Sequence, residues 1–145
     1  MTVPKDTMGR TGFVEQYGLW TGADAADAER VLAQIEENDI EVIRLSFPDQ
    51  HGILRGKTVM ASEAAQAMRN GCGLTTTLLA KDTSHTTVFP VFTPGGRFGI
   101  PEMEDAGDFV AVPIPASFRI LPWAPGTVWL LCDGYLDNGR EVPFS

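Results

Sequence analysis

The sequence predicts an α+β domain in which a small, mostly antiparallel sheet packs with helices. One stretch shows the three- and four-residue apolar spacing of an amphipathic helix, and a second, shorter one is bounded by residues that start and stop helices. Both occur among segments that read as strands. Clusters of Pro, Gly, Asn and Asp join several of the strand-like segments as hairpins. Helices inserted among hairpins are typical of α+β folds.

Composition limits the size and the class of the protein. The chain has 145 residues, an ordinary length for one domain, and 43% of them are hydrophobic. Its 11 basic and 19 acidic residues give a formal charge of −8, which argues against nucleic-acid binding. No signal peptide follows Met1 and no apolar run approaches membrane-spanning length, so we expect a cytoplasmic protein that binds no membrane.

The metal-ligating and thiol residues are few and dispersed. Cys72 and Cys132 form no CxxC motif, so we expect buried thiols in a reducing compartment rather than a disulfide. His51 and His85 are the only histidines, and no cluster of ligand residues predicts a metal site.

The first part of the chain reads as an arm followed by a helix. Residues 1–22 are rich in Gly, Thr and polar residues, and we expect a loosely held N-terminal arm or an extension that contacts a partner, with the domain proper at 23–145. Apolar residues at helical spacing predict a helix over 24–38, and aspartates in its first turn suit the positive end of the helix dipole.

A hairpin is predicted next. Residues 41–47 alternate apolar and polar side chains, which indicates a strand, and residues 53–60 read as its partner. The turn between them contains Pro48 and Gly52, which favour a tight reversal of the chain.

Shorter elements follow in the second half. Ser62 is a suitable N-cap for a helix over 63–70, which Gly71 would end, and the threonine-rich segment 74–79 is strand-like. Residues 81–101 form a long irregular segment, which in a compact domain is usually functional or part of an interface. Further strands are predicted over 108–114, 119–121 and 128–134, with a hairpin turn at 137–140.

Asp49 is the leading candidate for a functional residue. It lies at the predicted hairpin tip, which would project its side chain away from the core and towards a ligand or a neighbouring subunit. A carboxylate there can bind a cationic amine or ammonium, and it can take a proton from that amine before attack. The alternative is that Asp49 bonds only to the backbone of its own turn, as Asp commonly does.

Other polar motifs also allow more than one interpretation. Arg55 and Lys57 share one face of the second strand, with Gly56 between them. They could contact an anion or another subunit, with the glycine allowing close approach. Alternatively, they are charges on an exposed strand face that prevent the strand from pairing with another chain. His51 is interpreted as a turn or interface residue, and His85 could belong to a loop that closes over a pocket.

Three motifs are interpreted structurally. The glycine-rich segment 95–99 is a flexible turn rather than a phosphate loop, because it lacks the Gly-Lys-Ser/Thr ending. The acidic run over 102–108 is a solvated loop rather than a metal site. Trp123, bracketed by prolines, is expected to be a packing anchor.

Several of these motifs, in this order, resemble the N-terminal domain of the glutamine synthetase family. The resemblance covers about 23–145 and implies a β-grasp fold. The motifs are Phe47-Pro48-Asp49-Gln50-His51-Gly52, Arg55-Gly56-Lys57, Phe109-Val110-Ala111-Val112-Pro113, Leu121-Pro122-Trp123-Ala124-Pro125-Gly126-Thr127, Cys132-Asp133-Gly134 and Asn138-Gly139-Arg140.

The resemblance implies a ligase of nitrogen metabolism and glutamine biosynthesis. ATP, with Mg²⁺ or Mn²⁺, phosphorylates the γ-carboxylate of glutamate, and ammonia or an amine then displaces phosphate to give glutamine or a γ-glutamyl amide. Each active site lies between adjacent subunits of a homo-oligomeric ring. By motif match Asp49 takes the catalytic role of binding and deprotonating ammonium, and Arg55, Lys57 and His51 lie at the substrate site or the subunit interface.

The metal-holding and nucleotide-binding residues of that family lie beyond Ser145. We therefore expect these residues alone to bind no ATP or metal and to be inactive. Ammonia-using members carry Asp-Gly-Ser-Ser where this chain reads Gly73-Leu74-Thr75-Thr76-Thr77, and the Arg-Gly-Lys motif resembles relatives that use larger amines. The alternatives are a stand-alone or truncated non-catalytic β-grasp binding module, or a regulatory subunit that inserts the Asp49 hairpin into another ligase.

Overall fold

The computed structural model describes residues 11–88 and 100–143, except for the side chains of 104–106. The glycine-rich segment 95–99 and most of the predicted irregular segment therefore lie outside the described residues. The helices are α1 (Phe13–Gln16), α2 (Gly22–Glu37) and α3 (Ala64–Asn70), with 3-10 helices η1 (Ala61–Glu63), η2 (Thr76–Ala80), η3 (Pro101–Ala106) and η4 (Pro115–Ser117). The strands are β1 (Val42–Pro48), β2 (Leu54–Met60), β3 (Cys72–Thr75), β4 (Asp108–Pro113), β5 (Arg119–Ile120) and β6 (Thr127–Leu136).

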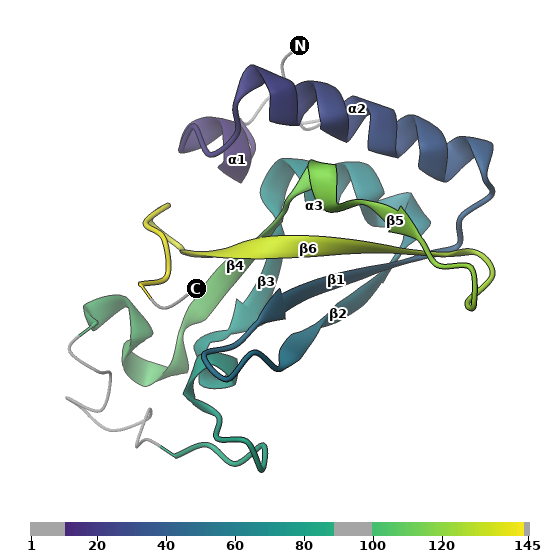
Figure 1. Cartoon of the computed structure of the whole chain (residues 1–145). Helices are drawn as coiled ribbons and strands as arrows, with labels where there is room; N and C mark the ends of the chain where they lie inside the picture. The colour runs from purple at the N-terminus through teal and green to yellow at the C-terminus, as the bar shows by residue number, and fades with distance from the viewer. Residues whose placement is uncertain (1–10, 89–99, 144–145) are drawn as a thin grey trace.

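The strands form one mixed sheet in the order β2-β1-β6-β4-β3, and β5 pairs with β6 off this path (Figure 1). The first and last long strands, β1 and β6, are parallel, whereas every other pairing of the described strands is antiparallel. The predicted α+β class with a small, mostly antiparallel sheet is therefore confirmed, and the arrangement is that of a β-grasp domain.

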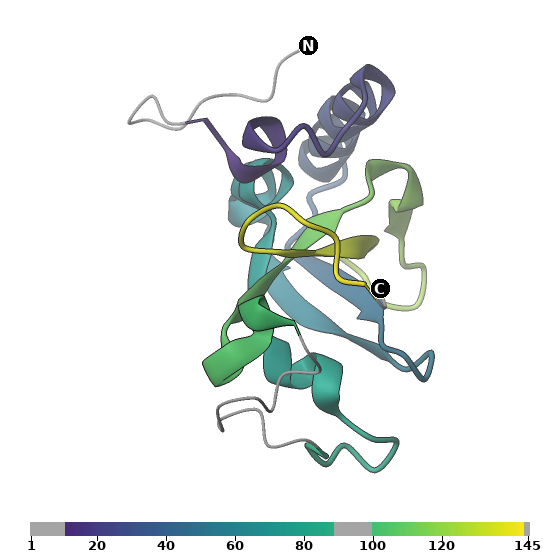
Figure 2. The same cartoon turned by 90° about the vertical axis from the view of Figure 1, so that its left-hand side faces the viewer.

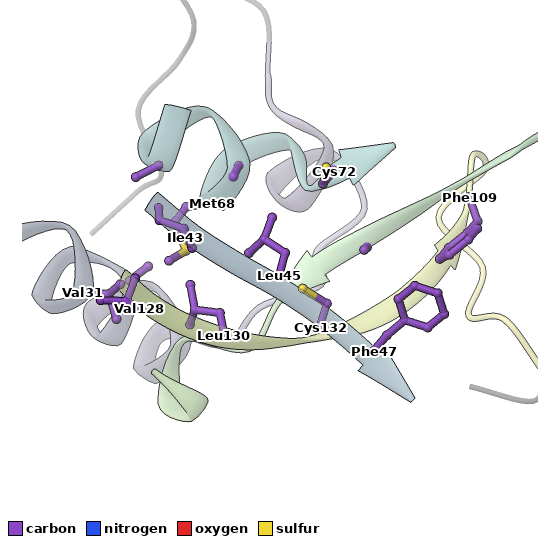
Figure 3. Close-up of a cluster of buried hydrophobic side chains, with 14 of the residues drawn as sticks. Val31, Ile43, Leu45, Phe47, Met68, Cys72, Phe109, Val128, Leu130 and Cys132 are labelled. Carbon is purple, nitrogen blue, oxygen red and sulfur yellow. The ribbon is translucent and has the colours of Figure 1, made fainter. Parts of the chain in front are cut away.

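One face of this sheet carries the core. Alternate residues of β1 and β6 point to the same side, and the helices α2 and α3 supply the opposing apolar side chains. The buried cluster includes Val31, Ile43, Leu45, Met68, Val128 and Leu130 (Figure 3). At the hairpin end of the sheet Phe47 packs edge-to-face on Phe109, with ring centroids 5.1 Å apart. The end of β1 is therefore anchored directly before the turn that follows it.

The start of α2 is fixed by reciprocal capping. The Asp24 amide donates to Thr21 Oγ1 at 3.2 Å, and the Thr21 amide donates to Asp24 Oδ2 at 2.8 Å. This capping box satisfies two amides at the helix N-terminus. Ahead of it, α1 buries Val14 against Val112 and Tyr135. The part of the 1–22 arm that the structure describes is thus packed on the domain rather than loosely held, and the boundary at 22 stays a prediction.

Two local predictions were wrong in their details. The threonine-rich strand predicted over 74–79 ends at Thr75, because the Thr75 hydroxyl accepts from the Thr77 amide and caps η2 instead. Side-chain capping here overrides the strand preference of threonine. Ser62 is not an N-cap, since it lies inside the 3-10 turn η1, and α3 begins at Ala64.

Trp123 is not a packing anchor. Trp123 is 74% exposed, because it lies in the tight turns between β5 and β6. In these turns the Ala124 amide donates to the Leu121 carbonyl, and the Thr127 amide donates to the Ala124 carbonyl. By contrast, Cys72 and Cys132 are confirmed as buried, unpaired thiols, and burial raises the pKa of Cys132 to about 12.

Among the described residues, none of the helices combines the length and the apolar character that crossing a bilayer requires.

Gly56 allows the close approach of β2 to β1. A Cβ atom built at this position would lie 1.9 Å from the Leu45 carbonyl oxygen, which is a backbone atom that cannot swing aside. We predict that Gly56→Ala lowers the free energy of unfolding by about 1–3 kcal/mol, measured by urea denaturation. Gly73→Ala in β3 is the matched control, because nothing lies within 4 Å of its added Cβ. Equal stability of the two variants would contradict this prediction.

Candidate functional site

The turn between β1 and β2 begins at Asp49 and closes on itself. The Asp49 amide donates to the Ile53 carbonyl, and the Gly52 amide donates to the Asp49 carbonyl, both at 2.9 Å. Gly52 has a φ of 77°, in the left-handed region that glycine adopts without steric cost. The predicted tight turn is therefore present, and it sets the direction of the side chain at its first residue.

The Asp49 side chain points inward, contrary to the expected outward projection. Its side chain is 0% exposed. Oδ1 accepts from the amides of His51 at 2.8 Å and Ile53 at 3.0 Å, and Oδ2 accepts from Arg55 Nε at 2.7 Å. An ionised carboxylate has about four acceptor positions, so three are filled and one on Oδ2 is left.

The surroundings of Asp49 favour its ionised form. Burial by itself raises the pKa of the carboxyl, but the Arg55 hydrogen bond, the two backbone amides and the Arg55 charge together lower the pKa below its ordinary value of 3.8. A carboxylate held in this way accepts protons weakly, and its negative charge is already paired with the Arg55 guanidinium. The site as it stands thus holds the cation of Arg55 and is a poor acceptor for a proton.

A second small hairpin lies beside this turn, and we call residues 81–87 the 81–87 hairpin. Lys81 and Thr87 form an isolated antiparallel bridge at its base. At its tip the Asp82 carboxylate accepts from the amides of Ser84 and Thr86, both at 2.9 Å, and from the Ser84 hydroxyl at 2.7 Å. The Ser84 hydroxyl and the other donors lower the pKa of Asp82.

Two side-chain contacts connect the two hairpins. Gln50 Nε2 donates to the Lys81 carbonyl at 3.3 Å, and Arg55 Nη1 lies 2.5 Å from His85 Nδ1. Both hairpins extend from the same end of the sheet, away from α2 (Figure 2). Arg55, whose side chain is only 5% exposed, therefore bridges the Asp49 carboxylate and the His85 ring.

The structure brings together only part of the predicted set. Asp49 and Arg55 are in contact, and His51 contributes its backbone amide. Lys57 is exposed on β2 opposite Leu45, on the same side as Arg55 but outside the cluster. The contact of His85 with Arg55 was not predicted. The sequence Asp82-Thr83-Ser84 indicates a turn before His85, but it does not indicate which residue the His85 side chain contacts.

The described residues include no group of three or more His, Cys, Asp and Glu side chains that could hold a metal ion. A hollow of about 430 Å³ lies between α2 and the start of α3, lined by Ile35, Ala61 and Ala64 among others, and it contains none of the hairpin residues.

The lowered pKa of Asp49 has a consequence for stability. A carboxyl whose folded pKa lies below its unfolded value stabilises the fold above that unfolded value, and the contribution is lost as the pH falls through the folded pKa. We predict that Asp49→Asn lowers the free energy of unfolding by about 3 kcal/mol at neutral pH, because the buried Arg55 guanidinium loses its carboxylate partner. Urea denaturation between about pH 5 and pH 2 should show a shallower loss of stability in the variant than in the unmodified chain. If the unfolding free energies of the variant and the unmodified chain fall in parallel as the pH is lowered, the lowered pKa of Asp49 would be contradicted.

No family model matches the chain. It is similar to a gamma-glutamylanilide synthase from an Acinetobacter species, with 37% identity over 134 residues, 90% of this chain and 27% of the relative. It is 31% identical to the gamma-glutamylethanolamide synthetase GlnA4 of Streptomyces coelicolor, covering 79% of this chain and 24% of that one. A glutamine synthetase of Methanosarcina mazei is 29% identical, over 81% of this chain and 22% of the relative.

Solved structures agree with the sequence relatives. The chain superimposes on a GmaS–ADP complex with a TM-score of 0.57 and 27% identity, covering 78% of this chain and 22% of that one. It therefore spans about a quarter of the length of the curated relatives that it matches. With a shared fold and similarity to several relatives along most of its length, the chain belongs to the glutamine synthetase family.

Proposed function

We propose that the complete protein is an ATP-dependent ligase that joins an amine to the γ-carboxylate of glutamate, and that residues 23–145 are its N-terminal β-grasp domain. The observation that carries the proposal is the pattern of similarity. Two synthetases of γ-glutamyl amides match at 37% and 31% identity, and the glutamine synthetase of Methanosarcina mazei matches at 29%. Because these relatives are enzymes, a stand-alone or truncated non-catalytic binding module is not favoured.

The chemistry assigns Asp49 to the amine. In the proposed step the amine nitrogen forms a bond to the activated γ-carbonyl carbon, the bond to phosphate breaks, and phosphate leaves with the electron pair. The nitrogen must also lose a proton, and a carboxylate beside it can bind the ammonium form and then accept that proton. The ionised state and fixed orientation of Asp49 support the first part of this role.

Arg55 competes with an amine for the same carboxylate. Its Nε occupies one acceptor position of Asp49 Oδ2, and the Asp49 side chain is closed off from solvent. A protonated amine would have to use the remaining position or displace the guanidinium. A protonated amine in that position would also be a cation and a hydrogen-bond donor, but unlike the guanidinium it carries a proton that it can give up. Binding of the amine in place of Arg55 would thus bring a transferable proton to the carboxylate.

The proposed partners are adjacent subunits of a homo-oligomeric ring. Family enzymes are generally oligomeric, and β2 is an edge strand of the described sheet, with Lys57 and His51 exposed near the Asp49 turn. These two residues, with Arg55, are placed at the substrate site or the subunit interface. The buried, unpaired cysteines fit a reducing compartment, and we propose the cytoplasm.

Family enzymes generally depend on ATP and a divalent metal ion, and Mg²⁺ or Mn²⁺ is proposed here. The described residues include no group of three or more His, Cys, Asp and Glu side chains that could hold a metal ion. In keeping with the family resemblance, we propose that both groups are bound by other parts of the complete protein. Bound ATP would supply the phosphoryl group that activates glutamate, whereas this chain would bind and orient the amine.

The test of the proposed function is an amine screen with the complete protein. Glutamate, ATP and Mg²⁺ are incubated with ammonia, ethanolamine or aniline, and products are identified by mass spectrometry. We expect an ATP-dependent γ-glutamyl amide with at least one organic amine. If no product forms, or if glutamine is the sole product, the proposal that the protein uses an organic amine would be contradicted.

The role of Asp49 is tested by Asp49→Asn in the complete protein. We predict that amine-dependent turnover falls by about 100-fold or more, because the carboxylate can no longer bind the cation and take its proton. Phosphorylation of glutamate, followed as ADP release without amine, should persist. Asp137→Asn, in the turn after β6, makes the same chemical change away from the site and should leave turnover unaltered. Unchanged turnover in Asp49→Asn would show that the assignment is wrong.

A further inference from the structure

The contact between the 81–87 hairpin and the β1–β2 hairpin includes a side chain that can change its charge. His85 Nδ1 lies 2.5 Å from Arg55 Nη1. A guanidinium in a protein keeps its protons and can only donate, so His85 Nδ1 must accept and the ring must be neutral, with its proton on Nε2. The contact therefore requires one charge state of the His85 ring.

Arg55 is the fixed partner in this contact. Its side chain is almost fully buried, and its Nε donates to the buried Asp49 carboxylate at 2.7 Å. Withdrawal of the guanidinium would leave two buried charges without partners, which is strongly unfavourable. If the His85 ring gained a proton, two cations would face each other, and the guanidinium could not move away at low cost.

The 81–87 hairpin, by contrast, is free to move. Residues 83–86 at its tip are exposed. The other hydrogen bond described between the two hairpins runs from Gln50 Nε2 to the Lys81 carbonyl and is 3.3 Å long. Its internal contacts, namely the Lys81–Thr87 bridge and the donors to the Asp82 carboxylate, do not involve the His85 ring. The hairpin can therefore detach without losing its own structure.

Four other charged groups lie around this contact. Asp49 and Asp82 have pKa values below the ordinary 3.8, so both stay ionised above about pH 5. The Ser84 hydroxyl is the largest cause of the lowered pKa of Asp82, and the charge of His51 contributes. A protonated His51 would thus attract the 81–87 hairpin and oppose its release. The Lys81 ammonium is engaged at the base of the hairpin.

We propose that His85 is a pH-sensitive switch that holds the 81–87 hairpin against the β1–β2 hairpin. The neutral ring accepts from Arg55 and keeps the hairpin in place, whereas the protonated ring is repelled by the guanidinium and the hairpin is released. Histidine ordinarily changes its charge between about pH 5 and pH 8. The inference goes beyond the proposed function and does not depend on it.

The backbone of His85 supports a requirement for this side chain. Its φ is 69°, in the left-handed region, which glycine or asparagine would occupy at lower cost. An unfavourable backbone conformation persists where the surroundings determine it, and such positions often occur in switch regions.

The experiment compares three variants of the complete protein with the unmodified one. His85→Asn keeps an acceptor, because its Oδ1 is as many bonds from the backbone as Nδ1 of histidine, but the asparagine does not titrate. His85→Gly removes the acceptor, and both substitutions suit the left-handed conformation. His51→Asn removes the other histidine near the contact and is the matched control.

The readout is hydrogen exchange followed by mass spectrometry at about pH 8 and pH 5, with labelling times scaled for the intrinsic exchange rates. In the unmodified protein we expect peptides covering 81–88 to exchange about tenfold faster at the lower pH, the effect of losing one hydrogen bond to a charged group. His85→Asn should exchange slowly and His85→Gly rapidly at both pH values. His51→Asn should respond to pH at least as strongly as the unmodified protein.

Peptides from β6 report opening of the whole domain and should exchange alike at the two pH values. The switch would be overturned if residues 81–88 of the unmodified protein exchanged equally at both pH values. It would also be overturned if His85→Asn kept the same pH response, or if the acceleration extended to β6. Loss of the pH response in His51→Asn would assign the titration to His51 instead.

Discussion

A carboxylate removed from solvent needs a donor for each of its oxygens, and the Asp49 side chain finds all of them in its own hairpin. Two amides of the turn bind Oδ1, and Arg55 at the start of β2 binds Oδ2. These contacts close the turn, define where β2 begins, and keep a guanidinium under the surface at the end of the sheet. The 81–87 hairpin then packs on that guanidinium through His85.

The same contacts determine the chemistry available to the site. Because Arg55 lowers the pKa of Asp49, the carboxylate is a good ligand for a cation and a poor base until the guanidinium moves away. A family that joins glutamate to ammonia or amines needs both properties in succession. An ammonium that replaced the guanidinium at Oδ2 would keep a cation beside the carboxylate and would also carry a proton that it can transfer.

Local patterns in the sequence were sufficient for the long strands, whereas the role of Asp49 depended on the family resemblance and stays a prediction. The alternation of Ile43, Leu45 and Phe47 predicted β1, and Pro48 with Gly52 predicted the turn. The inward direction of Asp49 was missed, because tip residues usually face solvent and the pairing with Arg55 depends on how the second strand returns. The contact with His85 joins residues separated by 30 positions, and no local pattern encodes it. Exposure of Trp123 likewise depends on the turns around it and not on its apolar character.

The most direct measurement is an NMR titration of the Asp49 carboxyl carbon in this chain. If Arg55 and the two amides hold the carboxylate as described, its apparent pKa will lie below the ordinary value of 3.8. A midpoint at or above 3.8 would mean that burial outweighs the donors, and that Asp49 is not bound to Arg55 in solution.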